Sequence, residues 1–402
     1  MTEGDVNFWD SLETLGHELL NREREIVHKR LPSTKKDKSS ASDDGENGSR
    51  GQVLRAIERL TETMIAALSK GQSPVLTYKD RQNSSNVSFD EDFGVVPSDN
   101  PVVKTVDFSA IKSTTRFART LQVLAISYRL VQTNTYSTKR DVFYNNTKLF
   151  GSQRVLDTIV DDIACMLEVP RHSLHILATS KGCVAGDLTL VDSDGSFLDC
   201  SVASGGTMVP AHVQHITNLH SNAKFVLVVE KDATFQKLLD DGFCRKLAPC
   251  ILVTGKGVPD LNTRMLVHKL WKAFHIPVFA LVDADPHGME IMCTYKYGSM
   301  ALSHESHSLT VPTLKWLGVL PSDVRRLCIQ EDVLLPMTDS DRAKARELLR
   351  RPYLSAEPLW RRELEEFMTR DRKAEIQSLI SISPTFLTDV YIPNKIKFGG
   401  WI

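Results

Sequence analysis

The sequence lacks any Cys-x-x-Cys pair, although seven cysteines occur along its 402 residues. An odd number of cysteines without paired spacing argues against a disulfide framework and against a structural zinc site. We therefore expect free thiols in a reducing compartment. The seven cysteines are Cys165, Cys183, Cys200, Cys244, Cys250, Cys293 and Cys328.

Two further absences concern membranes and export. No stretch of about 18 apolar residues is present, so we expect no membrane-spanning helix and no membrane partner. The first residues, MTEGDVNFWDSLETLGHELL, are acidic and lack the basic start and apolar run of a secretory leader. The sequons at Asn83, Asn86 and Asn145 are then interpreted as chance matches in an intracellular protein.

A strong excess of one charge is also missing, since 49 Lys and Arg balance 50 Asp and Glu for a net charge of −1. The local distribution is uneven, because residues 112–154 hold eight basic side chains and the single acid Asp141. A basic stripe of this kind is enough to face phosphates, so a near-neutral total does not exclude nucleic-acid binding. The eight are Lys112, Arg116, Arg119, Arg129, Lys139, Arg140, Lys148 and Arg154.

The first hundred residues are interpreted as helices separated by polar segments. Apolar spacing predicts an amphipathic helix within residues 7–30 and a second over 53–70, which ends at Gly71. Residues 33–51 have no large apolar side chain, so we predict a disordered linker. Its KKDK run is interpreted as solvated charge, with a nuclear localisation fragment as the alternative. Residues 71–100 are polar and loop-like.

The middle of the chain favours a small helical domain. Helical patterns run through 115–132, 138–147 and 152–168, and short strand-like runs follow at 188–191 and 197–202 around the turn Asp194-Gly195. Three helices followed by a hairpin form the outline of a winged helix. An ordinary helical domain with a basic surface fits the same pattern equally well.

From residue 225 the pattern becomes α/β. The runs at 225–230, 250–255 and 277–285 are rich in Val, Leu and Ile and are predicted to be strands, each followed by a helix. Continuous apolar strands that alternate with helices predict a parallel sheet covered on both faces. The C-terminal residues 338–381 are predicted to be mostly helical.

Three acids lie where these strands end. Glu230 ends the first strand, and Asp283 and Asp285 end the third. The Asp-x-Asp spacing puts both aspartates on one side of an extended chain, and ligands gather at the carboxyl ends of parallel strands. If the strands are neighbours, the three carboxylates form a site for Mg²⁺, which would offset their mutual repulsion. The alternative is that they are ordinary strand-end or helix-capping residues.

Tyr144 is a candidate nucleophile. In TKRDVFYNN, Arg140 precedes it by four residues, so both side chains share one face of a helix. A tyrosine has a pKa of about 10 and needs nearby positive charge to act as a nucleophile at neutral pH. Arg140 would supply that charge and grip a phosphate. The alternative is an aromatic residue beside a surface arginine.

Other catalytic motifs are missing. TGKG at 254–257 is not a phosphate-binding loop, because the required first glycine would fall at Cys250 and Gly257 stands where Ser or Thr should follow the lysine. HESH at 304–307 is not a His-Glu-x-x-His zinc motif, and no Gly-x-Ser-x-Gly elbow occurs.

Several segments together resemble motifs of the topoisomerase VI A-subunit family, and most of all its animal Spo-eleven branch, which starts meiotic recombination. The similarity runs from about residue 52 to the final NKIKFGGWI. The segments are STKRDVFYNNTKLFG (137–151), HILATSKGCVAG (175–186), FVLVVEKDATFQKLL (225–239), TGKGVPDLNTR (254–264) and LVDADPHGMEIMCTYKYGS (281–299).

The resemblance implies a mixed α/β fold in which a winged-helix, CAP-like domain carries the tyrosine and a Toprim domain binds Mg²⁺. By position, Tyr144 matches the nucleophile and Arg140 its supporting arginine, while Glu230, Asp283 and Asp285 match the metal-binding acids. We expect DNA contacts from Lys139, Lys181 and Lys256. The domains expected are a partner-binding N-terminal helix (1–32), the linker (33–51), a helix-and-loop extension (52–100), the winged helix (101–215) and the Toprim domain with a C-terminal extension (216–402).

The same resemblance implies a DNA transesterase of the nucleus that forms meiotic double-strand breaks through a 5′-phosphotyrosyl intermediate. Its expected partners are double-stranded DNA, a second copy of the chain, other meiotic break-formation factors and a B-type, ATPase-like subunit. In a homodimer, the tyrosine of one protomer would meet the metal of the other. Two alternatives remain open: a type IIB topoisomerase chain of the A type that reseals DNA, and a non-catalytic DNA-binding scaffold.

Overall fold

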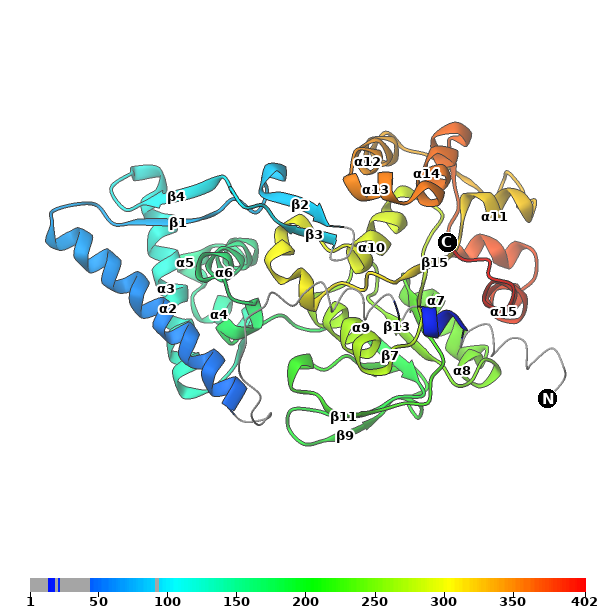
Figure 1. Ribbon diagram of the computed structural model, residues 1–402, viewed down its shortest axis with the longest axis horizontal. Helices are drawn as coiled ribbons and strands as arrows, with labels where there is room; N and C mark the ends of the chain where they lie inside the picture. The colour runs from blue at the N-terminus through cyan, green and yellow to red at the C-terminus, as the bar shows by residue number, and fades with distance from the viewer. Residues whose placement is uncertain (1–13, 19–20, 22–43, 91–93) are drawn as a thin grey trace.

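The computed structural model describes residues 14–18, 21, 44–90 and 94–402. These residues form an elongated molecule, with a mostly helical part at one end and a part built around a sheet at the other (Figure 1). None of the helices in the described ranges is long and apolar enough to cross a membrane.

The main sheet has six strands in the order β10-β7-β13-β12-β14-β15. At its centre, β12 (Val226–Val229) pairs in parallel with β13 (Ile251–Thr254) on one side and with β14 (Val278–Leu281) on the other. β15 (Lys315–Gly318) continues the parallel arrangement beyond β14. Every residue of β12, β13 and β14 is buried, as expected for strands covered on both faces. The predicted parallel sheet and mixed α/β class are confirmed.

Helices cover both faces of this sheet. Figure 1 shows α9 and α10 on one side of the sheet and α7 and α8 on the other. A helix follows each of the three central strands, as predicted, although the one after β12 is divided into two. The bounds are α7 (Asp232–Asp240), α8 (Phe243–Lys246), α9 (Leu261–Phe274) and α10 (Pro286–Lys296).

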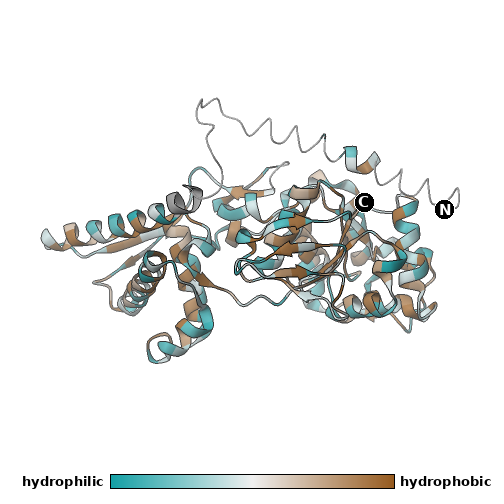
Figure 2. Ribbon diagram, turned by 90° about the horizontal axis from the view of Figure 1, so that it is seen from below, coloured by the Kyte–Doolittle hydropathy of each residue, from teal (hydrophilic) through white to brown (hydrophobic). Residues whose placement is uncertain are grey.

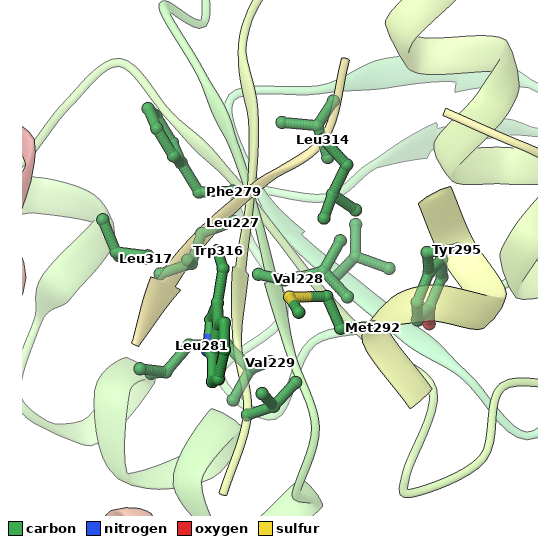
Figure 3. Packing of buried hydrophobic residues seen from close by; sticks show 14 of the residues in the cluster. Leu227, Val228, Val229, Phe279, Leu281, Met292, Tyr295, Leu314, Trp316 and Leu317 are labelled. Atoms are coloured by element: carbon green, nitrogen blue, oxygen red, sulfur yellow. The ribbon is translucent and has the colours of Figure 1, made fainter. Parts of the chain in front are cut away.

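The core of the sheet part is dense and apolar. Trp316 of β15 is fully buried beside Leu281 of β14, and Met292 and Tyr295 approach from α10 (Figure 3). Hydrophobic residues are concentrated on the central strands and on the helix sides that face them, while hydrophilic residues face outward (Figure 2). This burial is the main source of stability for the framework that carries the acids.

The sheet also includes strands that precede residue 216. β7 (Cys183–Gly186) pairs antiparallel with β13, and β10 (Thr207–Met208) pairs with β7. Strands of the main sheet therefore lie on both sides of the predicted domain boundary between residues 215 and 216. Sequence periodicity missed this connection because hydrogen bonding between distant strands leaves no local pattern.

The hairpin expected around Asp194-Gly195 is present as β8 (Thr189–Val191) and β9 (Phe197–Asp199), and β11 (Thr217–His220) pairs with β8. Its buried residues Leu188 and Leu190 belong to the core of the sheet and not to the core of the helices. Three helices followed by a hairpin thus occur in the predicted order, while the hairpin packs on the sheet part. The winged-helix assignment itself stays a prediction.

The helical part has its own core. Val123 and Val131 of α3, Ile159 and Ile163 of α6 and other buried side chains form a cluster separate from the sheet core. The three predicted helices are present, although the middle one is divided into two. The elements are α3 (Ile111–Thr133), α4 (Lys139–Asn145), α5 (Thr147–Phe150) and α6 (Gln153–Leu167).

The helix predicted over 53–70 is longer than expected. α2 extends over Asp44–Ser69, so residues 44–51, predicted as disordered linker, are helical. Arg50 explains part of this extension, because its guanidinium donates hydrogen bonds to the carbonyl oxygens of Val131 and Gln132 at 3.1 and 3.3 Å. The rest of that linker and most of the N-terminal helix lie outside the described residues, although 14–18 and 21 are helical.

The segment predicted as loop at 71–100 instead contains strands. β1 (Val75–Lys79) pairs antiparallel with β4 (Val103–Asp107), and between them β2 (Val87–Asp90) pairs with β3 (Gly94–Pro97). The β2–β3 hairpin reaches across to the sheet part, where the Val95 N–H donates to the Tyr297 carbonyl at 2.8 Å. Each of these strands has only four or five residues, which is too few for a clear alternating pattern in the sequence.

The C-terminal region is mostly helical, as predicted, and packs beside α10. Within it, residues 372–377 cross next to the acids, where Ala284 forms an isolated antiparallel bridge with Ala374. The helices here are α11 (Pro321–Arg326), α12 (Asp339–Leu349), α13 (Pro352–Ala356), α14 (Pro358–Arg370) and α15 (Ile392–Lys397).

Candidate active site

The adjacency of β12 and β14 brings two of the acids together. Val229 is the register partner of Leu281, so Glu230 and Asp283 follow directly at the same edge of the sheet. The Glu230 carboxylate accepts a 2.8 Å hydrogen bond from the backbone N–H of Asp283. The condition set by the sequence, that the two strands be neighbours, is met.

Asp285 lies two residues after Asp283, where it caps α10. Its carboxylate accepts a 2.7 Å hydrogen bond from the Gly288 N–H, and Pro286 occupies the first turn of the helix. An acid at this position is stabilised by the unpaired N–H groups and the positive end of the helix dipole. The strand ladder ends at Leu281, so Asp283 and Asp285 lie on the connection into α10 and not within a regular strand.

Gly288 is a part of this site that the sequence did not reveal. A Cβ at this position would lie 2.6 Å from the Asp283 carbonyl oxygen and 3.0 Å from Glu230 Oε2. The residue must therefore be glycine for α10 to approach the acids so closely. The glycine in DADPHG was visible, but the need for it depends on how tightly the helix packs on Glu230.

The acids are held in an environment that disfavours their charge. Burial, followed by repulsion from Asp283 and Asp285, raises the pKa of Glu230 to about 7. Burial also raises the pKa of Asp283, although the Lys231 ammonium and the Ile376 amide act in the opposite direction. A divalent cation would relieve this repulsion, and carboxylate oxygens are the donors that Mg²⁺ prefers.

The donor set therefore fits Mg²⁺, with Glu230, Asp283 and Asp285 as the residues that would hold it. Within the described ranges, no group of three or more His, Cys, Asp or Glu side chains is already arranged around a common metal position. Both oxygens of Asp283 are engaged by other groups of the protein.

Two of the expected DNA contacts border this site. Lys181 and Lys256 are neighbours, since the Lys181 ammonium donates to the Lys256 carbonyl at 3.2 Å. The loop that carries Lys256 is fixed to the acids, because the Gly257 N–H donates to the Glu230 carbonyl at 2.8 Å. Lys181 is exposed, and Lys256 is half-buried with its ammonium 3.4 Å from Asp232.

Lys139, the third expected contact, is placed differently. Its side chain is only 12% exposed, and its ammonium lies 3.3 Å from Asp157 and 3.8 Å from Asp161. Arg171 and Arg81 contact Asp161 as well, at 2.6 and 3.3 Å. Burial lowers the pKa of the Lys139 ammonium despite the favourable charge of Asp161. This placement favours a structural role for Lys139 inside the helical part.

Of the basic stripe at 112–154, part is also used internally. Arg116 pairs with Asp162, and Arg119 donates to the Leu149 carbonyl at 2.7 Å. Five members are exposed and remain suited to contact phosphates: Lys112, Arg129, Arg140, Lys148 and Arg154.

Tyr144 and Arg140 lie on α4, as predicted. A capping box fixes the start of this helix, because Thr138 and Asp141 exchange hydrogen bonds between their side chains and backbone N–H groups. The buried residue Val142 anchors one side of the helix, while Arg140 and Tyr144 are both exposed. The Tyr144 side chain is 68% exposed.

The structure does not bring Tyr144 to the acids of its own chain. α4 belongs to the helical part, whereas Glu230, Asp283 and Asp285 lie at an edge of the sheet (Figure 1). A side chain that is 68% exposed is not packed against carboxylates of the same chain. If these residues act together, a second copy must supply one half of the site.

Comparisons with known proteins bear directly on these residues. Residues 225–396 match the model of the Toprim domain shared by Spo11 and the A subunit of topoisomerase 6, and residues 115–176 match a type IIB DNA topoisomerase model. The first range contains the three acids, and the second contains α4 with Tyr144.

Whole-chain relatives agree with these matches. The chain is 51% identical to the human meiotic recombination protein SPO11 over 354 residues, covering 88% of this chain and 89% of the relative. The mouse protein of the same name is 50% identical over the same shares. The A subunit of DNA topoisomerase 6 from Arabidopsis thaliana is 35% identical, covering 87% of this chain and 81% of that protein.

Proposed function

The chain belongs to the family of Spo11 and the topoisomerase 6 A subunit and is a topoisomerase-like DNA transesterase that initiates meiotic recombination, and we propose that Tyr144 of one copy acts at the acids of another. One observation supports this composite site. Tyr144 is exposed on the helical part, while Glu230 and Asp283 meet at the edge of the sheet. A homodimer would join the two halves twice and cut both strands.

The chemistry follows from the groups present. The Tyr144 phenolic oxygen attacks the phosphorus, the bond to the 3′-oxygen breaks, and a 5′-phosphotyrosine and a 3′-hydroxyl result. The phenol loses a proton, and the 3′-oxygen gains one. Arg140, one helical turn away, stabilises the negative charge on the phosphate oxygens. Mg²⁺ bound by Glu230, Asp283 and Asp285 would supply further neutralising charge.

DNA binding would use the exposed cations near each half of the site. Lys181 contacts Lys256, whose loop is hydrogen-bonded to Glu230, while Arg140 shares α4 with Tyr144 and the exposed Lys148 follows on α5. Contacts of this kind go to phosphates, so we expect binding that depends on salt and only weakly on sequence. The burial of Lys139 removes it from this set.

The helical part offers a surface for the B-type subunit. A groove of about 780 Å³ runs between α2 and α3, and its apolar lining includes Ile65, Leu68 and Phe108. These three side chains are 61%, 58% and 48% exposed. We propose that the B-type subunit docks here, that other break-formation factors join the assembly, and that the protein acts in the nucleus.

Resealing of DNA distinguishes the meiotic activity from that of a true topoisomerase. The human and mouse meiotic relatives are 51% and 50% identical to this chain, against 40% and 35% for two plant topoisomerase 6 chains of the A type. The higher identity favours break formation without strand passage. A relaxation assay of supercoiled DNA, run with the B-type partner, separates the two.

The direct test of the nucleophile is to trap protein-linked DNA ends in denaturant and sequence them. The wild-type chain should give 5′ ends attached to protein, and Tyr144→Phe should give none. Tyr136→Phe is the matched control, because Tyr136 lies outside both α4 and the docking groove and its ring stacks on His175, a contact that Phe can keep. Adducts that persist in Tyr144→Phe would refute the proposed nucleophile.

A further inference from the structure

Lys231, the residue after Glu230, places a cation beside Asp283. Its Nζ lies 2.8 Å from Asp283 Oδ2 and 3.2 Å from Glu375 Oε1. The same Nζ donates to the Gln377 side-chain oxygen at 3.4 Å. The Lys231 side chain is 26% exposed and that of Asp283 is 7% exposed, so the pair is largely shielded from solvent.

The second oxygen of Asp283 is also engaged. The backbone N–H of Ile376 donates to Asp283 Oδ1 at 2.9 Å. On either side, Ala284 and Ala374 exchange backbone hydrogen bonds at 2.8 and 3.1 Å. Residues 374–377 therefore form a C-terminal strap that is bound to Asp283 directly and through Lys231.

This arrangement conflicts with a metal on the same oxygen. Mg²⁺ binds carboxylate oxygens at about 2.0–2.1 Å. An ammonium group 2.8 Å from Asp283 Oδ2 would lie within a few ångström of that ion, where two positive charges repel strongly. Binding of the metal at Asp283 Oδ2 therefore requires Lys231 to withdraw.

We propose that Lys231 is a resident counter-ion of the metal site. In the metal-free protein its ammonium neutralises Asp283 and ties this acid to the C-terminal strap. Mg²⁺ competes with the ammonium for Asp283, so Lys231 lowers the affinity of the site for the metal and keeps the acids ordered without it. This inference rests on the proposed metal site.

The test is metal binding by the full chain without DNA, with Mn²⁺ as the probe and free Mn²⁺ measured by electron paramagnetic resonance. Lys231→Met should bind Mn²⁺ more tightly, on the order of tenfold, because the competing charge is gone. Lys231→Gln should do the same, since it keeps a donor for Asp283 but carries no charge. Lys231→Arg should stay near wild type because the cation is retained.

Lys237→Met is the matched control. Lys237 lies on α7 with a side chain 30% exposed and pairs with Asp241 at 3.1 Å, so its removal changes the net charge equally without touching the acids. Its Mn²⁺ affinity should match the wild type. Unchanged or weaker Mn²⁺ binding by both Lys231→Met and Lys231→Gln would overturn the proposal.

Failure of the metal site itself has a different signature. In that case the wild-type chain would bind no Mn²⁺, or would bind it equally well after Asp283→Asn. Wild-type binding that is lost in Asp283→Asn, together with tighter binding in Lys231→Gln, supports both the site and its counter-ion.

Discussion

The carboxylate of Asp283 accepts a 2.9 Å hydrogen bond from the backbone N–H of Ile376, which lies 93 residues further along the chain. This bond makes the C-terminal extension part of the candidate metal site. Lys231 adds a second link, because its ammonium contacts both Asp283 and Glu375. Asp283 is thus positioned by Lys231, which follows Glu230, and by Ile376 in the C-terminal strap. Several consequences can be measured.

A mixture of two inactive variants should recover activity if the site is shared between copies. Tyr144→Phe keeps the acids, and Glu230→Gln keeps the tyrosine, so a mixed dimer contains one complete site. We expect single-strand nicks with protein on one 5′ end from the mixture, and none from either variant alone. Nicked plasmid on a gel measures this. A mixture as inactive as its components would exclude a site built in trans.

Gly288→Ala should damage the site through sterics alone. The new Cβ would lie 2.6 Å from the Asp283 carbonyl oxygen and 3.0 Å from Glu230 Oε2. We expect a loss of about 1–3 kcal/mol in the free energy of unfolding and weaker Mn²⁺ binding. Chemical denaturation and Mn²⁺ titration measure the two effects. Gly205→Ala is the control, because its nearest neighbour would be 3.7 Å away, and equal effects of both variants would contradict the close approach.

Metal affinity should rise with pH through the neutral range. The pKa of Glu230 is raised to about 7 in the metal-free protein, so its carboxyl holds a proton below that pH and must release it to bind a metal. We expect Mn²⁺ binding to strengthen between pH 6 and pH 8 and to release a proton near pH 7.

The Glu230 carboxyl should also make the stability of the metal-free protein depend on pH. Its folded pKa lies above the unfolded value, so between about pH 4.5 and pH 7 the folded state binds more protons and metal-free stability falls as the pH rises. Glu230→Gln should flatten both pH dependences. A wild-type profile identical to that of Glu230→Gln would show that another group titrates.

The three lysines predicted to contact DNA should have two different roles, DNA binding and stability of the fold. The double variant Lys181→Ala, Lys256→Ala should bind DNA more weakly. The salt dependence of its DNA-binding constant should fall by the equivalent of about 1–2 phosphate contacts. Its stability should change little. Lys139→Met should instead lower the free energy of unfolding by about 1–2 kcal/mol, because Asp157 and Asp161 lose a largely buried partner. Binding isotherms at several salt concentrations and urea denaturation test this.

The exposed Lys148→Met is the control for Lys139, and its stability should be unchanged. If Lys139→Met leaves stability intact but reduces the salt slope, its predicted DNA contact would regain support.

The groove between α2 and α3 should be dispensable for the fold but required for docking of the B-type subunit. Ile65→Asp and Leu68→Asp place a charge on side chains that are 61% and 58% exposed, so stability should change little. Co-purification with the B-type subunit should be lost, while binding to DNA persists. Val202→Asp, at a side chain 77% exposed on the sheet part, is the control. Normal co-purification of both groove variants would locate the docking surface elsewhere.

Elements with strong local patterns could be predicted from the sequence alone. Buried strands at 226–229, 251–254 and 278–281 are continuous apolar runs, and helices α3, α6 and α9 follow helical spacing, so both were predictable. The sequence also predicted that Glu230 and Asp283 lie where strands end. It likewise placed Arg140 and Tyr144 four residues apart on one helix.

Which of these residues contact one another depends on the tertiary fold. It paired β7 with β13 across the predicted boundary and buried Lys139 among acids. It also brought Ile376 and Lys231 onto Asp283 and left Tyr144 in the open. The physical reason is that strand and helix patterns report contacts between near neighbours, whereas ion pairs and packing depend on residues tens to hundreds of positions apart.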